Sequence, residues 1–364
     1  MINLAKVIIA IAIAMLALTI GFGGGDIDTD EFALGTNNQL GVDRLDGQRV
    51  HCQALDTAGE CIQASIARGY SKRLVWLGNS QLHAINQSGE GDVTAPVLLA
   101  DKLRQHEIDA VSFSQPNANF LEHQIVYHYL KQKLDPEILV LPAVFDDTRE
   151  EQIRDDILLG IQEPTVLQDL AGTKSLTIAQ AEGGNYSGTS ASERQNLQSI
   201  VEDELDAGLS SVWTGWAARE EARSAISIAL YRLRNSILGI KPTSKRKKIP
   251  SRYIDNLLAF EQLVCNAVES DILTIVYIAP IRNDYAPPYI ASEYEGFRSD
   301  VHNITRDCSA HFVNLENLVP NNLWGTKEAT TVGGEPELDF MHFQFPGHVI
   351  LADEIEKQVL SALK

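Results

Sequence analysis

Short apolar runs and longer amphipathic stretches alternate along most of the chain. The apolar runs have the length and the flanking turn residues of buried strands, and they lie at 73–77, 108–113, 138–141, 273–279 and 311–315. The stretches with apolar residues at helical spacing lie at 95–106, 120–134, 253–270 and 296–308. Strands that alternate with helices indicate a parallel sheet with helices on both faces. We therefore expect an α/β fold, a three-layer sandwich built on a mainly parallel sheet.

The N-terminal residues 1–25 form an apolar segment. Lys6 is followed by an uncharged apolar run from Val7 to Ile20, which continues through glycines to Gly25. Its length of about twenty residues suits either a membrane helix that anchors the chain or a signal peptide. No clean small-x-small cleavage site follows the run, which favours the anchor. In both cases the rest of the chain lies outside the cytoplasm, in the periplasm or at the cell surface.

Charge and cysteine content narrow the class of protein. The 364 residues carry a formal net charge of −19, which argues against a nucleic acid partner, because phosphate binding needs concentrated positive charge. Of the three ways to pair the four cysteines, we predict Cys52–Cys61 and Cys265–Cys308, which suit an oxidising compartment. The alternative is four unpaired buried thiols, as in a cytosolic protein. No spacing typical of metal-binding cysteines is present, and we expect no cofactor.

The strand at 73–77 leads into a candidate nucleophile. Gly78 allows a tight turn at the end of this strand, and Asn79 and Ser80 precede a stretch with few helix breakers. A serine at such a strand–turn–helix junction can act as a nucleophile, and its own amide can help to bind an oxyanion. The alternative interpretation is an ordinary Gly-Asn-Ser turn.

A candidate base stands near the other end of the chain. Asp339 and His342 are three residues apart, so one turn of chain can bring both side chains to one side. A serine nucleophile needs such a base, and the base needs a carboxylate to orient it. His348 is the nearest alternative base, but its place after Pro346-Gly347 favours a structural role. His83 either lines the pocket or lies on the polar surface.

Together, these two blocks resemble those of the SGNH/GDSL hydrolase family. In that family a Gly-Asp-Ser or Gly-Asn-Ser block lies near the start of the domain. An Asp-x-x-His block lies near its end, with a glycine five residues after the histidine. Here Gly78-Asn79-Ser80 matches the first block, and Asp339, His342 and Gly347 match the last. The resemblance implies an SGNH-like catalytic domain at 71–364 with a Ser80–His342–Asp339 triad and no metal, preceded by a linker and small capping segment at 26–70.

The resemblance also implies an oxyanion hole, with a glycine from a second block and an asparagine from a third. The second block corresponds to Ser112–Asn119, which has no glycine, so Asn117 or Asn119 is the candidate donor. In the third block Asp146 stands where an asparagine is expected, and an ionised carboxylate cannot donate a hydrogen bond. We retain all three as candidate oxyanion or substrate-binding residues.

Residues 172–252 form an insertion relative to a minimal member of that family. It contains two predicted helices, 193–208 and 214–238, which can serve as a lid, a docking surface for a membrane partner or an extra packing layer. It ends in a basic loop, 241–252, with Lys245, Arg246, Lys247 and Lys248. This loop either touches anionic headgroups or polymers, or is simply solvated.

Within the family, the anchor and the Asn-containing first block resemble extracytoplasmic members. These are the anchored proteins of lipoteichoic acid D-alanylation and the alginate O-acetylation proteins, which work beside membrane-bound O-acyltransferases. The resemblance implies an esterase or O-acyltransferase that acts on acylated cell-envelope polysaccharide through an acyl-Ser80 intermediate. Two alternatives stay open. One is a non-catalytic carbohydrate-binding or assembly protein that partners a membrane O-acyltransferase, and the other is a secreted lipase released by signal cleavage.

Overall fold

The computed structural model describes residues 38–181 and 243–364, except 53, 54, 56, 152 and 330, together with 235–237 and 239. The chain divides into two compact units. The larger comprises Asn37–Tyr186, Pro242–Thr326 and Leu338–Lys364, and it contains the sheet and the candidate site. The predicted N-terminal anchor and the predicted helix 193–208 lie outside the described residues, as does 214–238 apart from the helical residues 235–237. None of the helices that are described combines the length and the apolar character needed to cross a membrane.

Six of the described strands form one sheet in the order β10-β9-β8-β5-β7-β4, and each neighbouring pair is parallel. The strands are β4 (His51–Cys52), β5 (Lys72–Gly78), β7 (Ile108–Ser114), β8 (Ile138–Ala143), β9 (Leu273–Ile278) and β10 (His311–Asn314). The five strands predicted from apolar runs correspond to β5, β7, β8, β9 and β10. The prediction of a mainly parallel sheet is therefore confirmed.

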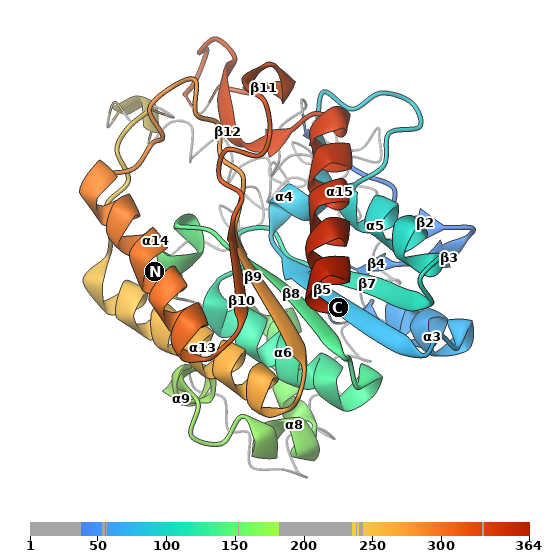
Figure 1. The fold of residues 1–364 in the computed structure, drawn as a ribbon. Helices are drawn as coiled ribbons and strands as arrows, with labels where there is room; N and C mark the ends of the chain where they lie inside the picture. The colour runs from blue at the N-terminus through green and yellow to red at the C-terminus, as the bar shows by residue number, and fades with distance from the viewer. Residues whose placement is uncertain are drawn as a thin grey trace, which may run out of the picture. The chain divides into compact units, whose positions relative to one another are not determined.

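Helices cover both faces of this sheet (Figure 1). On one face lie α5 (Ala95–Arg104) and α15 (Phe345–Ala362), and on the other lie α3 (Ala58–Arg68), α6 (Phe120–Leu134), α13 (Pro250–Glu269) and α14 (Ala291–Asp307). Alternate side chains of β5 supply the two cores. Leu74 and Trp76 pack with α5 and α15, whereas Val75 and Leu77 pack with α6 and α13. This is the expected three-layer α/β arrangement.

Two elements within residues 38–68 pack with the main sheet. The strand β4 lies in the main sheet, with His51 opposite Ser112, and α3 packs against the same core. The strand β1 (Asn38–Leu40) pairs antiparallel with β6 (Ala84–Asn86). These strands are two or three residues long, too short to show a period in the sequence, so the sequence pattern does not predict their place in the fold.

The remaining described elements are short. They are β2 (Arg44–Leu45), β3 (Gln48–Arg49), α4 (Ser80–His83), α7 (Asp155–Leu158), α8 (Pro164–Asp169), α9 (Lys174–Ala181), β11 (Trp324–Lys327), β12 (Glu337–Phe343) and the 3-10 turns Asp146–Thr148, Leu159–Gln162 and Asn321–Leu323. The helix expected after Ser80 thus lasts only four residues before β6 begins.

Both predicted disulfides are present. Cys52–Cys61 joins β4 to α3, and Cys265–Cys308 joins α13 to the end of α14. The first bridge ties an edge strand of the main sheet to a helix, and the second ties two helices on the same face of the sheet. The pairing prediction is therefore confirmed.

Candidate active site

The nucleophile turn is built at the carboxyl end of β5. Asn79 is the N-cap of α4, and its side-chain oxygen accepts a hydrogen bond from the Gln81 N–H at 3.1 Å. Gly78 is required by space, because a Cβ there would lie 2.3 Å from a methyl carbon of Leu82. This close turn leaves Ser80 as the first residue of α4, half-buried and open to solvent.

The candidate base stands on β12 rather than on a helical turn. The Asp339 side chain accepts hydrogen bonds from the backbone N–H groups of Met341 and His342, both at 2.9 Å. Such a local contact bends the chain, as in an Asx-turn, and brings Asp339 and His342 to one side. At the exit of β12, Gly347 avoids a clash, because a Cβ there would lie 2.7 Å from the Phe343 ring.

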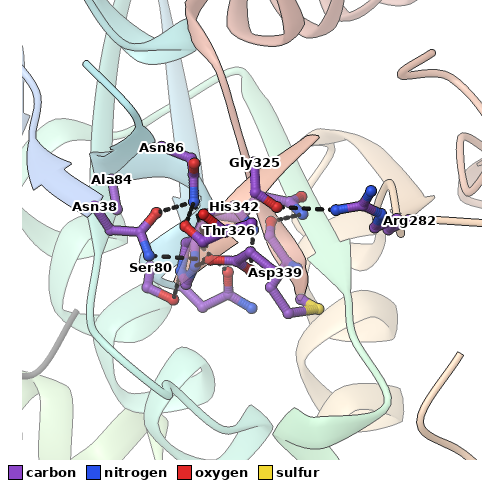
Figure 2. Close-up of polar contacts among 12 residues, drawn as sticks. Asn38, Ser80, Ala84, Asn86, Arg282, Gly325, Thr326, Asp339 and His342 are labelled. Carbon is purple, nitrogen blue, oxygen red and sulfur yellow. Dashed lines mark hydrogen bonds and ion pairs between the residues drawn. The ribbon is translucent and has the colours of Figure 1, made fainter. Parts of the chain in front are cut away.

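The three side chains form one hydrogen-bonded line (Figure 2). His342 Nε2 lies 2.9 Å from Ser80 Oγ, and His342 Nδ1 lies 2.9 Å from Asp339 Oδ2. The side chain of Asp339 is 3% exposed and that of His342 is 14% exposed, so the line runs from the interior toward solvent. This geometry allows the imidazole to accept the Ser80 proton while the carboxylate holds the other ring nitrogen.

Electrostatics keep Asp339 ionised. Burial by itself raises the pKa of the Asp339 carboxyl, but the charge and side-chain hydrogen bond of His342, with two backbone N–H donors, outweigh it. The pKa of Asp339 therefore lies well below its usual range. A carboxylate that stays charged can stabilise the imidazolium that forms when His342 takes up a proton.

Two asparagines that sequence reasoning missed also contact Asp339. Asn38 Nδ2 lies 3.0 Å from Asp339 Oδ2, and Asn86 Nδ2 lies 3.3 Å from the same oxygen. Both asparagines are fully buried. Neither belongs to a recognisable motif, and only the β1–β6 pairing brings them to the site.

The predicted oxyanion residues have other surroundings. Asn119 is the N-cap of α6 and accepts from the Glu122 N–H at 2.9 Å, while Asn117 is exposed with φ of 52°. The first N–H groups of a helix have no acceptor within it, and Asn79 already binds that of Gln81. The N–H of Ser80 is therefore the candidate oxyanion donor.

Asp146 is held in a group of ionic and polar contacts. It pairs with Arg246 and with Arg149, the latter at 3.2 Å, and it accepts a hydrogen bond from the Tyr289 hydroxyl at 3.0 Å. Asp146 is thus an acceptor, not a donor for an oxyanion. The next residue, Asp147, instead reaches the nucleophile turn, because it accepts from Asn79 Nδ2 at 3.2 Å.

Part of the predicted basic loop is bound by the protein itself. Besides the Arg246–Asp146 pair, Lys245 Nζ donates to the Pro287 carbonyl at 2.6 Å, and Lys248 Nζ lies 3.5 Å from the centre of the Tyr253 ring. The loop is therefore more than a solvated connection, and its charge is partly used within the fold.

The other histidines near the site are buried and neutral. His348 accepts from the Ala95 N–H and donates to the Ala84 carbonyl, both at 3.2 Å, so it links α15 to α5 and β6. His51 and His83 flank Ser114 Oγ at 2.6 and 2.7 Å. Burial lowers the pKa of His51 to about 3 and holds the pKa of His83 well below its usual range. His83 is 1% exposed and thus lies in the core rather than on the polar surface.

Within the described ranges, no group of three or more His, Cys, Asp or Glu residues is placed to hold a metal ion.

Comparisons with known proteins found similarity to solved structures at low sequence identity. No family model and no curated protein matches the chain. Among solved structures, a Bacteroides fragilis protein provisionally assigned as an acylhydrolase shares 10% identity at a TM-score of 0.39, over 85% of this chain and 98% of that one. A GDSL-like lipase of Bacteroides thetaiotaomicron shares 10% identity at a TM-score of 0.38, over 85% and 99%. The acetylxylan esterase of Geobacillus stearothermophilus shares 10% identity at a TM-score of 0.38, over 80% and 95%.

Proposed function

We propose that the chain is a serine-dependent ester hydrolase with Ser80 as nucleophile, His342 as general base and acid, and Asp339 as the orienting carboxylate. The single observation that carries the proposal is the hydrogen-bonded line in which His342 lies 2.9 Å from both partners. A half-buried serine at one end and a buried, ionised carboxylate at the other match the division of roles in a triad.

The reaction runs in two halves. Ser80 Oγ attacks the ester carbonyl carbon while its proton moves to His342 Nε2, and the N–H of Ser80 stabilises the carbonyl oxygen that becomes negative. The C–O bond to the alcohol then breaks, and His342 returns the proton to the leaving oxygen. A water molecule or a sugar hydroxyl next gives its proton to His342 and attacks the acyl-Ser80 ester. The acid or new ester leaves, and the proton returns to Ser80.

The finer proposal is an extracytoplasmic enzyme acting on acylated cell-envelope polysaccharide, as esterase or as O-acyltransferase. The two disulfides support an oxidising compartment, because such bridges are rare in reducing ones. The apolar segment 7–25 supports attachment to a membrane, where a membrane-bound O-acyltransferase is the proposed partner. The solvent-open Ser80 supports a substrate whose ester is carried on a larger molecule.

The second candidate function is a non-catalytic, carbohydrate-binding or assembly protein. It is favoured by Asp146, which stands at the position expected for an oxyanion donor but is held as an acceptor by two arginines and Tyr289. An oxyanion site with fewer donors loses transition-state stabilisation, since one donor contributes about 10²–10³ in kcat.

The test is turnover of p-nitrophenyl acetate by wild type, Ser80→Ala and Ser299→Ala, the last an exposed serine on α14. We expect Ser80→Ala to lower kcat/KM by about 10³-fold or more and Ser299→Ala to match wild type. Mass spectrometry of the quenched wild-type reaction should show one acetyl group on Ser80. Equal activity of the Ser80 variant and wild type, or no turnover by either, would favour the binding role.

A further inference from the structure

Asn38 and Asn86 form a buried amide pair beside the triad. They are opposite each other in the β1–β6 ladder, and Asn86 Nδ2 lies 2.9 Å from Asn38 Oδ1. Asn86 Nδ2 also lies 2.9 Å from the Thr326 carbonyl and 3.3 Å from Asp339 Oδ2. All three neighbours are acceptors, so the nitrogen of the Asn86 amide has to face them. The pair is thereby oriented to donate toward the carboxylate of Asp339 (Figure 2).

Among the described residues, five N–H groups converge on this carboxylate. The backbone of Met341 and His342 donates to Oδ1, whereas Oδ2 receives His342 Nδ1, Asn38 Nδ2 and Asn86 Nδ2. A carboxylate offers about four lone-pair sites, so this group is saturated. The two amides bind the same oxygen that faces the imidazole, and they therefore act on the proton shared with His342 rather than on a distant part of the carboxyl.

The chain also keeps space for the Asn86 side chain. A Cβ on Gly325 would lie 1.7 Å from Asn86 Oδ1 and 2.6 Å from Asn86 Cγ. Any residue larger than glycine at 325 has to displace the amide. Asn86 is thus fixed by hydrogen bonds on its nitrogen side and by a close backbone approach on its oxygen side.

We propose that Asn38 and Asn86 are positioning residues that hold the Asp339 carboxylate in place and set the basicity of His342. Gly325 has no side chain and so leaves room for the Asn86 amide. This inference rests on the proposed role of Asp339 in the triad. The locked carboxylate keeps Oδ2 aimed at Nδ1, and the amides share its negative charge. The site is therefore assembled from a strand that precedes the nucleophile in sequence as well as from the nucleophile turn and β12.

The direction of the effect follows from the charge on Oδ2. When an amide donor is removed, less of that charge is shared, and the carboxylate stabilises the imidazolium more strongly. The imidazole then keeps its proton to higher pH. Since the base has to be neutral to accept the Ser80 proton, the acidic limb of kcat/KM moves to higher pH by the same amount.

The first experiment follows the imidazole directly, by an NMR pH titration of the His342 Cε1–H signal. That signal is identified among the nine histidines by its loss in His342→Gln. We expect Asn38→Leu and Asn86→Leu each to raise the midpoint by about 0.5–1 pH unit. Asn86→Asp, which adds a negative charge, should raise it by about 1–2 units. Asn256→Leu is the matched control. Asn256 is equally buried, but it accepts a hydrogen bond from the Phe120 N–H and donates one to the Glu150 carbonyl, away from Asp339.

A double-mutant cycle tests the role of Gly325. Gly325→Ala should reproduce the midpoint shift of Asn86→Leu, because its methyl group displaces the amide. In the Asn86→Ala background the same glycine substitution should cause no further shift, since the clash is gone. A shift of equal size in both backgrounds would show that Gly325 acts independently of Asn86.

Kinetics complete the test. Asn38→Leu, Asn86→Leu and Asn86→Asp should each lower kcat by about 10-fold, as is typical when a residue that hydrogen-bonds a catalytic group is removed. They should leave KM unchanged, because neither amide touches substrate. If wild type turns over esters but the midpoints of all variants equal that of wild type, the inference is overturned and the proposed function stands. If no ester is turned over, the proposed function fails, and the NMR midpoints still decide whether the amides act on His342.

Discussion

Gln81 donates its side-chain amide to the Met341 carbonyl at 2.7 Å and to the Pro280 carbonyl at 2.9 Å. The residue after the nucleophile is thereby fastened to the residue before the base, across 260 positions of sequence. Because Gln81 is 2% exposed, these bonds are made in the interior, where an unpaired carbonyl is costly. The contact fixes how α4 and β12 approach each other, and so it fixes the Ser80–His342 distance.

Gln81→Leu should therefore loosen the site as well as the fold. Two buried carbonyls lose their donor, so we expect a loss of about 2 kcal/mol in the free energy of unfolding. A displacement of 1 Å between reacting groups costs about 100-fold, so kcat should fall by about 10- to 100-fold. Urea unfolding and kcat at saturating substrate measure the two effects. Gln124→Leu is the control, because Gln124 is equally buried but bonds Ser175 and Gln262; it should lose stability and keep kcat.

The contacts of Asn79, the second residue of the nucleophile block, require an amide side chain. Asn79 donates to the Asp147 carboxylate, and burial holds the pKa of Asp147 well above its usual range, although the bond from Asn79 acts to lower it. We expect Asn79→Asp to cost about 3 kcal/mol at pH 7, because it places a second carboxyl against a buried one without a donor between them. Urea unfolding at pH 7 and pH 5 should show a smaller loss at the lower pH, where the pair can hold a proton.

The partner substitution sharpens this test. In the Asn79→Asp background, Asp147→Asn restores one amide and one carboxylate in the same space, and most of the lost stability should return. Asn283→Asp, an identical change at an exposed position, should stay within about 0.5 kcal/mol of wild type. If the double variant is no more stable than Asn79→Asp alone, the cost arises elsewhere than in the Asn79–Asp147 contact.

The strands that the sequence predicted well are those long enough to form a recognisable apolar run. The strands β5, β7, β8 and β9 are six or seven residues long, and most of their residues are buried. By contrast, β4 has two residues and β1 and β6 have three, so their pairing depends on contacts that no local pattern encodes. The part of the fold that was missed is therefore the part made of the shortest strands.

The same limit applies to the candidate site. Ser80, Asp339 and His342 stand in blocks with fixed spacing, and the structure brings these three together. Spacing in the sequence cannot distinguish the roles of Asp146 and Asp147. In the structure both lie in the 3-10 turn at Asp146–Thr148, where Asp147 contacts Asn79 and Asp146 contacts Arg246. Asn38, Asn86 and Gly325 matter only through a three-way contact between distant segments, which a single sequence does not reveal.

The buried histidines predict how stability depends on pH. Burial lowers the pKa of His348 to about 3, despite the opposing hydrogen bond to the Ala84 carbonyl. An ordinary histidine in the unfolded chain titrates near pH 6.5. Stability from this depressed pKa is present above about pH 6.5 and is lost as the pH falls toward 3, because the unfolded chain then binds the proton. His51 and His123, with pKa values of about 3, and His128, at about 4, act in the same direction.

His348→Gln should flatten this dependence. Each such histidine contributes at most about 1.4 kcal/mol per pH unit, so the slope of unfolding free energy at pH 5 should fall by about that amount relative to wild type. Urea unfolding at pH 7, 6, 5 and 4 gives the slope. The exposed His311 supplies the control, and His311→Gln should keep the wild-type slope. Identical slopes for wild type and His348→Gln would contradict a neutral His348 in the folded chain.

The two disulfides should differ in how much they stabilise the fold. Cys265–Cys308 closes a loop with a sequence separation of 43, whereas Cys52–Cys61 closes one of only 9. Since a cross-link restricts the unfolded chain more when its loop is longer, Cys265→Ser/Cys308→Ser should cost about 4 kcal/mol and Cys52→Ser/Cys61→Ser about 3 kcal/mol. Urea unfolding of both variants measures the difference.

The two bridges should also differ in their effect on activity. Cys52 lies on β4, which pairs with β7, and the end of β7 lies beside Gly78 of the nucleophile turn. Loss of the Cys52–Cys61 bridge should therefore lower kcat, whereas loss of the α13–α14 bridge should not. Unchanged kcat in both variants would show that the bridge at β4 does not affect the geometry of the site.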